Sequence, residues 1–200
     1  MRRGRSHTGR GWLMIMLLVA ACQGQLPAVS PGSSTADAGD KQEALLLGEM
    51  KREDVEVAMP EWVSSVVESE PDIEASLGLT DLTTDARVTV FFGSWCSDSR
   101  RELSRLWKAL DVAGGETSFP IRYVGVDRSK TEPATELGGR TLLYVPTLIV
   151  EDRDGIELGR IIEESPHGVE VDLLALLEGN ASGWISARQD LPQPVERAGR

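Results

Sequence analysis

The stretch RVTVFFGSWCSDSRRELSRLWKAL, residues 87–110, decides the fold of this 200-residue chain. Residues 87–92 are mostly β-branched and aromatic, which is typical of a buried strand. A Gly-Ser pair then turns the chain, and apolar residues recur at the spacing of one helix face. This pattern predicts an amphipathic helix that begins just after Cys96 and ends before residue 114. Its apolar positions are Leu103, Leu106, Trp107 and Leu110.

The residues that follow add three strands and a helix to this start. Residues 121–126 read as a second strand, and a strand, helix and strand this close together predict a parallel, right-handed βαβ unit. Residues 147–151 and 156–162 predict a hairpin around an Asp-Gly turn, and 168–178 a closing helix. We therefore expect an α/β fold in which helices flank a central mixed sheet of about four strands.

The flanks of this domain, which we place at residues 84–179, differ in character. Residues 41–83 carry apolar residues at helical spacing, including Trp62, and predict an N-terminal helical extension that packs on the domain. The alternative, a separate interaction arm, would leave Trp62 exposed. Residues 180–200 are polar and predict a C-terminal tail.

The N-terminus reads as an export signal. Residues 1–21 join four arginines to an apolar run of ten residues, which is too short to span a bilayer. The run ends in LVAAC, which resembles the lipobox of bacterial lipoproteins and implies acylation of Cys22. The alternative is an ordinary secretory signal that leaves Cys22 as a free thiol.

The segment at and after the lipobox cysteine predicts how the domain is attached to the cell envelope. Residues 22–40 are rich in Pro, Gly, Ser and Ala and predict a flexible tether. The resemblance to lipoproteins implies a periplasm-facing protein attached to the membrane of the cell envelope by its lipid. Gln23, rather than Asp, follows the lipobox cysteine, which under the sorting rule of those proteins indicates the outer membrane.

Composition excludes two classes of function. The chain has 21 basic and 32 acidic residues, a net charge of −11, so nucleic-acid phosphates would repel it. It has two cysteines and two histidines, too few for a Cys/His zinc site. We expect no metal and no cofactor.

Two short motifs stand at matching places in this order of elements. Trp95-Cys96-Ser97-Asp98-Ser99 follows the first strand of the domain, and Val145-Pro146-Thr147 precedes the hairpin. Together they resemble the thioredoxin superfamily, which implies a three-layer fold with Cys96 as nucleophile. Ser99 replaces the second cysteine of the family's W-C-x-x-C motif. The resemblance also implies that Pro146 is cis and faces the nucleophile.

The chemistry expected of this site follows from a single sulfur. Helix N-termini favour anions, so the thiolate of Cys96 is stabilised there, with Ser99 as a hydrogen-bond donor and Asp98 opposing. With Cys22 acylated, no second thiol remains, so Cys96 would form a mixed disulfide that an external thiol resolves. Candidate substrate-binding residues are Trp95, Val145, Pro146 and Thr147. The partners would be protein or small-molecule thiols and disulfides of the envelope.

A second class of function stays open at this point. Cys96 can be a small half-buried side chain on a fold used only for binding, which would make the protein a non-catalytic adaptor. A peroxidase is disfavoured because a sulfenic acid at Cys96 would lack a resolving thiol. His167 has no partner near it in sequence and reads as a surface or capping residue. The sequence does not indicate an oligomeric state.

Overall fold

The computed structural model describes residues 45–191. The chain divides into two units, residues 1–40 and 41–200, and every described residue belongs to the second. The expected signal peptide (1–21), its acylated Cys22 and the tether (22–40) lie outside the described residues. The elements are β1 (Gly48–Met50), α1 (Arg52–Ala58), α2 (Pro60–Glu68), α3 (Ile73–Asp81), β2 (Arg87–Phe92), α4 (Ser97–Val112), β3 (Ile121–Gly125), α5 (Ala134–Leu137), β4 (Thr147–Glu151), β5 (Glu157–Ile162), α6 (Val169–Leu177) and β6 (Gly183–Ile185).

The sheet is mixed and has six strands in the order β1-β3-β2-β4-β5-β6. The central pair, β2 and β3, is parallel, as the βαβ prediction requires, while β4 runs antiparallel to β2 and pairs with β5 as a hairpin. The expectation of about four strands is corrected by two short edge strands. β1 pairs antiparallel with β3, and β6 pairs parallel with β5.

Both additional strands come from segments that were expected to have other structures. β1 lies in the N-terminal extension, which the sequence predicted to be helical, and β6 lies in the segment expected to be a tail. Each has three residues, which is too short to show the alternation by which a strand is recognised.

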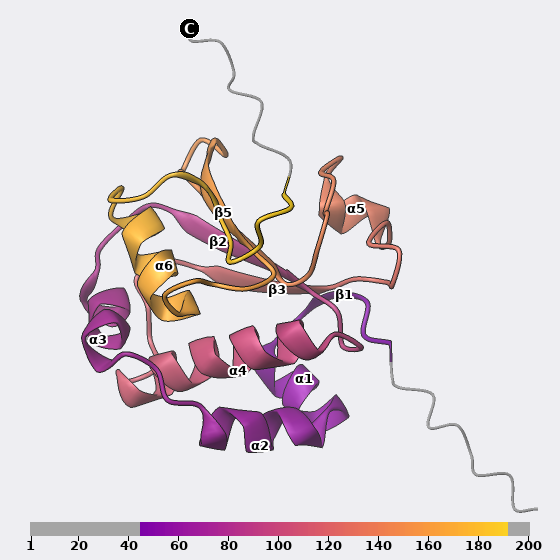
Figure 1. Ribbon diagram of the computed structural model, residues 1–200, viewed down its shortest axis with the longest axis horizontal. Helices are drawn as coiled ribbons and strands as arrows, with labels where there is room; N and C mark the ends of the chain where they lie inside the picture. The colour runs from indigo at the N-terminus through magenta and orange to yellow at the C-terminus, as the bar shows by residue number, and fades with distance from the viewer. Residues whose placement is uncertain (1–44, 192–200) are drawn as a thin grey trace, which may run out of the picture. The chain divides into compact units, whose positions relative to one another are not determined.

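The larger core lies between one face of the sheet and five helices, α1, α2, α3, α4 and α6 (Figure 1). Alternate residues of β2, namely Val88, Val90 and Phe92, point into this core. The four apolar residues predicted for the helix after Cys96 are all buried there. Trp62 of α2 packs on Phe92 and Trp107, with ring centroids 5.7 and 5.8 Å apart. The N-terminal helices are therefore part of the domain core.

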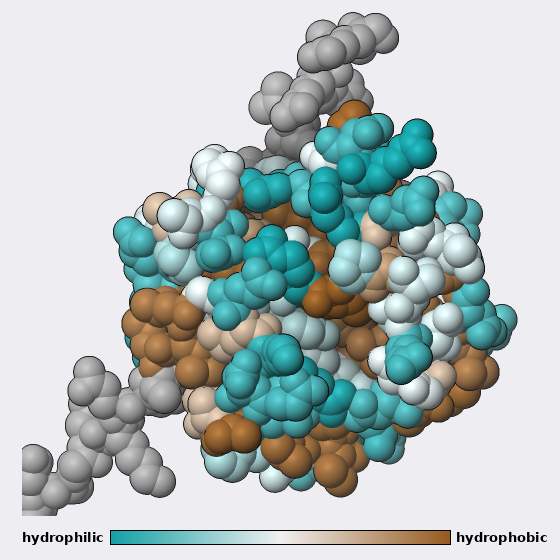
Figure 2. Space-filling view, turned by 180° about the vertical axis from the view of Figure 1, so that it is seen from behind, coloured by the Kyte–Doolittle hydropathy of each residue, from teal (hydrophilic) through white to brown (hydrophobic). Residues whose placement is uncertain are grey.

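The opposite face of the sheet carries a smaller core. Phe91, Val124 and Ile149 pack there against Leu137 of α5 and Val145 of the following loop. Seen from behind, the protein surface carries hydrophobic patches among hydrophilic residues (Figure 2). A pocket of about 310 Å³ on the Phe91 face of the sheet is lined by Phe91 and by charged side chains that include Arg87, Arg122, Arg140 and Glu151. Each of these arginines is ion-paired with a glutamate.

Candidate functional site

Cys96 lies at the N-terminal end of α4, directly after the turn that follows β2. Its backbone is extended, with φ −102° and ψ 122°, so it is the N-cap residue of the helix. Its N–H donates to the Gly93 carbonyl at 2.9 Å, and its carbonyl accepts from the Arg100 N–H at 3.1 Å. The sulfur is therefore held beside the helix N–H groups that lack partners in the first turn, where negative charge is favoured.

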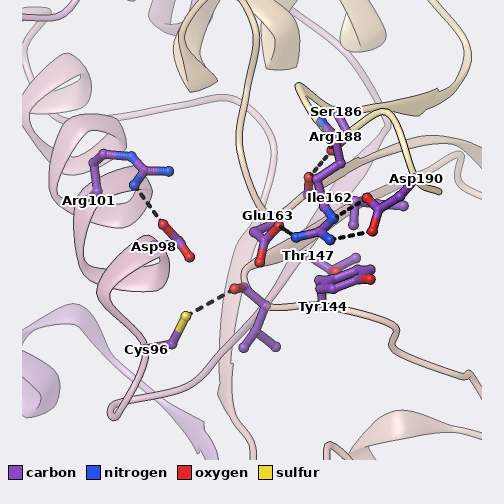
Figure 3. A network of polar contacts seen from close by, with 11 residues as sticks. Cys96, Asp98, Arg101, Tyr144, Thr147, Ile162, Glu163, Ser186, Arg188 and Asp190 are labelled. Atoms are coloured by element: carbon purple, nitrogen blue, oxygen red, sulfur yellow. Dashed lines mark hydrogen bonds and ion pairs between the residues drawn. The ribbon is translucent and has the colours of Figure 1, made fainter.

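The sulfur faces the loop that precedes β4. Cys96 Sγ donates to the Val145 carbonyl at 3.2 Å, across 49 positions of sequence (Figure 3). The Val145–Pro146 peptide bond is cis, as the resemblance implied. The sheet brings the two segments together, because β2 and β4 are adjacent and Phe91 near the end of β2 pairs with Thr147 at the start of β4.

The candidate substrate-binding residues differ in exposure. Val145, Pro146 and Thr147 are buried, and the Thr147 hydroxyl donates to the Tyr144 carbonyl at 2.7 Å. Trp95 is partly exposed, and its ring Nε1 donates to the Val126 carbonyl at 3.3 Å. Trp95 and Cys96 are thus the accessible residues near the sulfur, and both pack against the smaller core, which includes Val145.

The turn before Cys96 depends on a glycine. A Cβ on Gly93 would stand 2.6 Å from the Trp95 ring, closer than atoms can approach. Only glycine leaves room for the indole to fold back over the turn. Gly93 therefore helps to place Trp95 beside the sulfur.

Ser99 has a different contact from the one expected. Its side chain is fully buried, and its Oγ accepts a hydrogen bond from the Gly93 N–H at 3.1 Å. The expected donation to the Cys96 sulfur is not among the hydrogen bonds of the described residues. The first turn of α4 carries Ser99 inward, toward the backbone of the preceding turn. Its observed contact supports the loop that presents Cys96.

The charge on Asp98 is offset within the same helix. Arg101 Nη1 lies 2.6 Å from Asp98 Oδ1, and Arg101 Nε lies 3.1 Å from Glu102 Oε1. Asp98 therefore opposes a thiolate at Cys96 less than an unpaired carboxylate would. Glu102 points to the protein interior, and burial raises the pKa of its carboxyl group.

A small pocket of about 130 Å³ opens beside Cys96. Its walls are Glu61 and Trp62 of α2, residues 94–97, and Arg100 of α4. A second pocket of about 370 Å³, lined by Ser65 and Glu68 of α2 and by Ser69 directly after it, shares Ser97 and Arg100 with the first. The contribution of α2 was not predicted, because no sequence pattern indicates which helix of the extension packs beside residue 96.

The segment after β6 also contacts the proline loop. The Arg188 guanidinium stacks on the Tyr144 ring, with its carbon 3.9 Å from the ring centroid. It is held there by ion pairs of 2.6 Å with Glu163 and with Asp190 (Figure 3). The sequence predicted a C-terminal tail over residues 180–200. The structure instead brings this segment against the loop that faces Cys96.

Within residues 45–191, no group of three or more His, Cys, Asp or Glu side chains could hold a metal ion. No helix in this range has the length and apolar character needed to cross a bilayer. His167 is exposed, as expected, but it does have a partner near it in sequence, because its Nδ1 lies 2.9 Å from Oδ1 of Asp172, five residues on.

Sequence comparisons identify no relatives of this chain. No protein-family model matches it, and no curated protein matches it. The solved structures that resemble it include a protein of unknown function from Pseudomonas aeruginosa and an HIV epitope-scaffold. Each has a TM-score of 0.50 and 18% sequence identity, over 67% of this chain and 94% of its own.

A third solved structure also matches this chain. Mitochondrial thioredoxin 3 from Saccharomyces cerevisiae, in its oxidized form, matches with a TM-score of 0.27 and 20% identity, over 57% of this chain and 97% of that one. The mixed sheet, the cysteine at the start of α4 and the cis proline before β4 together give this chain a thioredoxin-like α/β fold.

Proposed function

We propose that this protein is a thiol–disulfide exchange enzyme that works with one thiol, Cys96. The observation that carries the proposal is the position of the sulfur. It is partly exposed at the N-terminus of a 16-residue helix, 3.2 Å from the carbonyl that precedes a cis proline, and it opens into a pocket. A buried structural cysteine would have neither the helix N-terminus nor the pocket.

The reaction needs two exchange steps. The Cys96 thiolate attacks one sulfur of a substrate disulfide R–S–S–R′, forming Cys96–S–S–R and releasing R′–S⁻. An external thiolate then attacks the R sulfur of the adduct, which regenerates the Cys96 thiolate and leaves R in a new disulfide. Electrons balance, because each step exchanges one S–S bond for another.

Two groups near the sulfur act in opposite directions. The Val145 carbonyl accepts from the neutral thiol and so favours the S–H form. The free N–H groups of the first turn of α4 favour the thiolate. A substrate whose N–H took over the Val145 carbonyl would remove the interaction that stabilises the S–H form, so binding would promote reaction.

The envelope location belongs to the same proposal. Residues 1–22 support export and acylation at Cys22, which would leave Cys96 as the one thiol of the mature chain. Growth with a clickable palmitate should label the wild-type chain and fail to label Cys22→Ala. Equal labelling of both would contradict the anchor without affecting the chemistry at Cys96.

The experiment for the enzymatic step is capture of the adduct. The protein is incubated with 2-hydroxyethyl disulfide, and the mass of the mixed disulfide is measured before and after addition of dithiothreitol. We expect one adduct on Cys96, released by the reductant, and none on Cys96→Ala with the same circular dichroism. An unmodified Cys96, at concentrations where free 1-thioglycerol exchanges readily with the same disulfide, would reject the proposal.

One observation favours a second candidate, a non-catalytic binding module. The Ser99 hydroxyl accepts from the Gly93 N–H, and within residues 45–191 no hydrogen bond joins it to the Cys96 sulfur. On this reading, Cys96→Ala keeps its full affinity for envelope partners captured by the wild type. Loss of those partners in Cys96→Ala, with covalent adducts in the wild type, favours the enzyme.

A further inference from the structure

The pocket beside Cys96 carries one group of each charge. Arg100 lies on its α4 wall and Glu61 on its α2 wall, and both residues are exposed. No ion pair joins either residue to another within residues 45–191. Neighbouring arginines of α4 differ in this respect, because Arg101 is paired with Asp98 and Arg105 with Glu170.

Helix geometry places Arg100 on the same side as the sulfur. Arg100 follows Cys96 by four residues and donates its N–H to the Cys96 carbonyl. Residues four apart lie on one helix face, about 5–6 Å from each other at Cβ, and helical side chains lean toward the N-terminus. The guanidinium can therefore reach a group attached to whatever sulfur binds Cys96.

Glu61 approaches from the other wall. It lies in the first turn of α2, and the neighbouring Trp62 is anchored in the core against Phe92 and Trp107. The position of α2 relative to α4 is thus fixed by buried aromatic rings. The pocket between them keeps a cation and an anion apart, each without an ion partner among the described residues.

We propose that this pocket selects small disulfides that carry both a carboxylate and an ammonium group near the sulfur, as a free amino-acid disulfide does. Arg100 binds the carboxylate and Glu61 the ammonium. The volume of about 130 Å³ suits one such half-molecule, and the adjoining pocket beyond Arg100 receives the leaving half. A cysteine within a peptide chain has neither free group, so a protein disulfide would gain nothing from the pair. The inference rests on the proposed exchange chemistry at Cys96.

The test compares four disulfides that differ in charge. Cystine, cystamine, 3,3′-dithiodipropionate and 2-hydroxyethyl disulfide are zwitterionic, cationic, anionic and neutral. Rates of adduct formation at Cys96 are measured by mass spectrometry at low salt and divided by the rates with free 1-thioglycerol, a neutral thiol that gives a distinct product with each disulfide. We expect the largest normalised rate for cystine. Two unit charges ~7 Å apart, at an effective dielectric of about 40–80, change a rate about threefold to sevenfold.

Two substitutions separate the roles of the charges. Arg100→Gln should lower the rates for cystine and dithiodipropionate relative to the neutral disulfide, while Glu61→Gln should lower those for cystine and cystamine. Both effects should shrink at 1 M salt, where the screening length is about 3 Å. Lys108→Gln is the matched control, since Lys108 lies further along α4 and does not line the pocket.

The two proposals fail in different ways. If wild type forms an adduct with the neutral disulfide, but neither substitution changes the ratios among the four, the charge selection is wrong and the exchange chemistry stands. If wild type forms no adduct with any of the four, the exchange chemistry itself is wrong.

Discussion

Replacement of Ser99 by alanine separates a structural role for this residue from a chemical one. The Ser99 Oγ accepts from the Gly93 N–H at 3.1 Å, and both residues are buried. Alanine removes the acceptor and leaves the N–H of Gly93 without a partner inside the protein. The turn that presents Cys96 should lose stability as a result.

The size of the loss follows from the burial. A buried donor that loses its acceptor costs about 1–3 kcal/mol, because it gave up water on folding and regains nothing. For a chain of this size, about 2–4 °C of melting temperature corresponds to each kcal/mol, so we expect Tm to fall by about 2–12 °C. Full exposure of Ser99 would have made the same change nearly neutral.

The assays are thermal melting and urea denaturation, both followed by circular dichroism, with Ser97→Ala as the control. Ser97 is exposed in the same helical turn, so its alanine variant should stay within about 0.5 kcal/mol of wild type. The reasoning is refuted if the Ser99 and Ser97 variants unfold at the same urea concentration. A change in the pH profile of Cys96 alkylation at unaltered stability would instead restore Ser99 as a donor to the sulfur.

Three further predictions concern the core and its titrating groups. Trp62→Ala should lower the free energy of unfolding measured in urea by about 3–5 kcal/mol, because the ring is buried against Phe92 and Trp107. Val63 is exposed, so Val63→Ala should lower it far less. Equal losses of stability in the two variants would mean that α2 is not packed as described. Burial raises the pKa of Glu102, so its carboxyl group contributes most to stability at low pH, and this contribution is lost as the pH rises through the pKa of the folded state. Glu102→Gln should therefore gain stability relative to wild type between pH 4 and pH 7. A difference in unfolding free energy between the two proteins that does not change with pH would contradict this. Burial also raises the pKa of Tyr123 to about 12, so the free energy of unfolding should fall as the pH rises from about 10 to 12. Absorbance at 295 nm should show a tyrosine ionisation near pH 12 that is missing in Tyr123→Phe. If that ionisation is missing in Tyr144→Phe instead, it does not belong to Tyr123 and the prediction is wrong.

Much of the fold could be predicted because its signals are local. The strand at Arg87–Phe92 has the expected bounds, and so does the strand that follows Pro146. The helix after Cys96 buries the residues that its periodicity selected. Period-2 and period-3.6 patterns depend on neighbours within a few positions, which a single sequence displays directly.

The errors fall where no such pattern exists. β1 and β6 have three residues each, and their membership of the sheet depends on pairing with β3 and β5. Arg188 stacks on Tyr144 across more than forty positions, in a segment whose polar composition indicated a tail. Composition describes what a segment can bury, and says little about a short polar segment that pairs with the edge of an existing sheet.

In the candidate site too, some features depend on neighbouring residues and others depend on tertiary packing. By itself, the sequence determined that a cysteine begins an amphipathic helix and that a proline precedes a strand, since both are properties of a few adjacent residues. Only the tertiary structure decided that the sulfur meets the Val145 carbonyl, that Ser99 turns to Gly93, and that Glu61 and Arg100 share a pocket. The physical reason is that these contacts depend on how the core packs the helices and strands against one another. Packing depends on the shapes of residues far apart in the chain, and no local pattern records it.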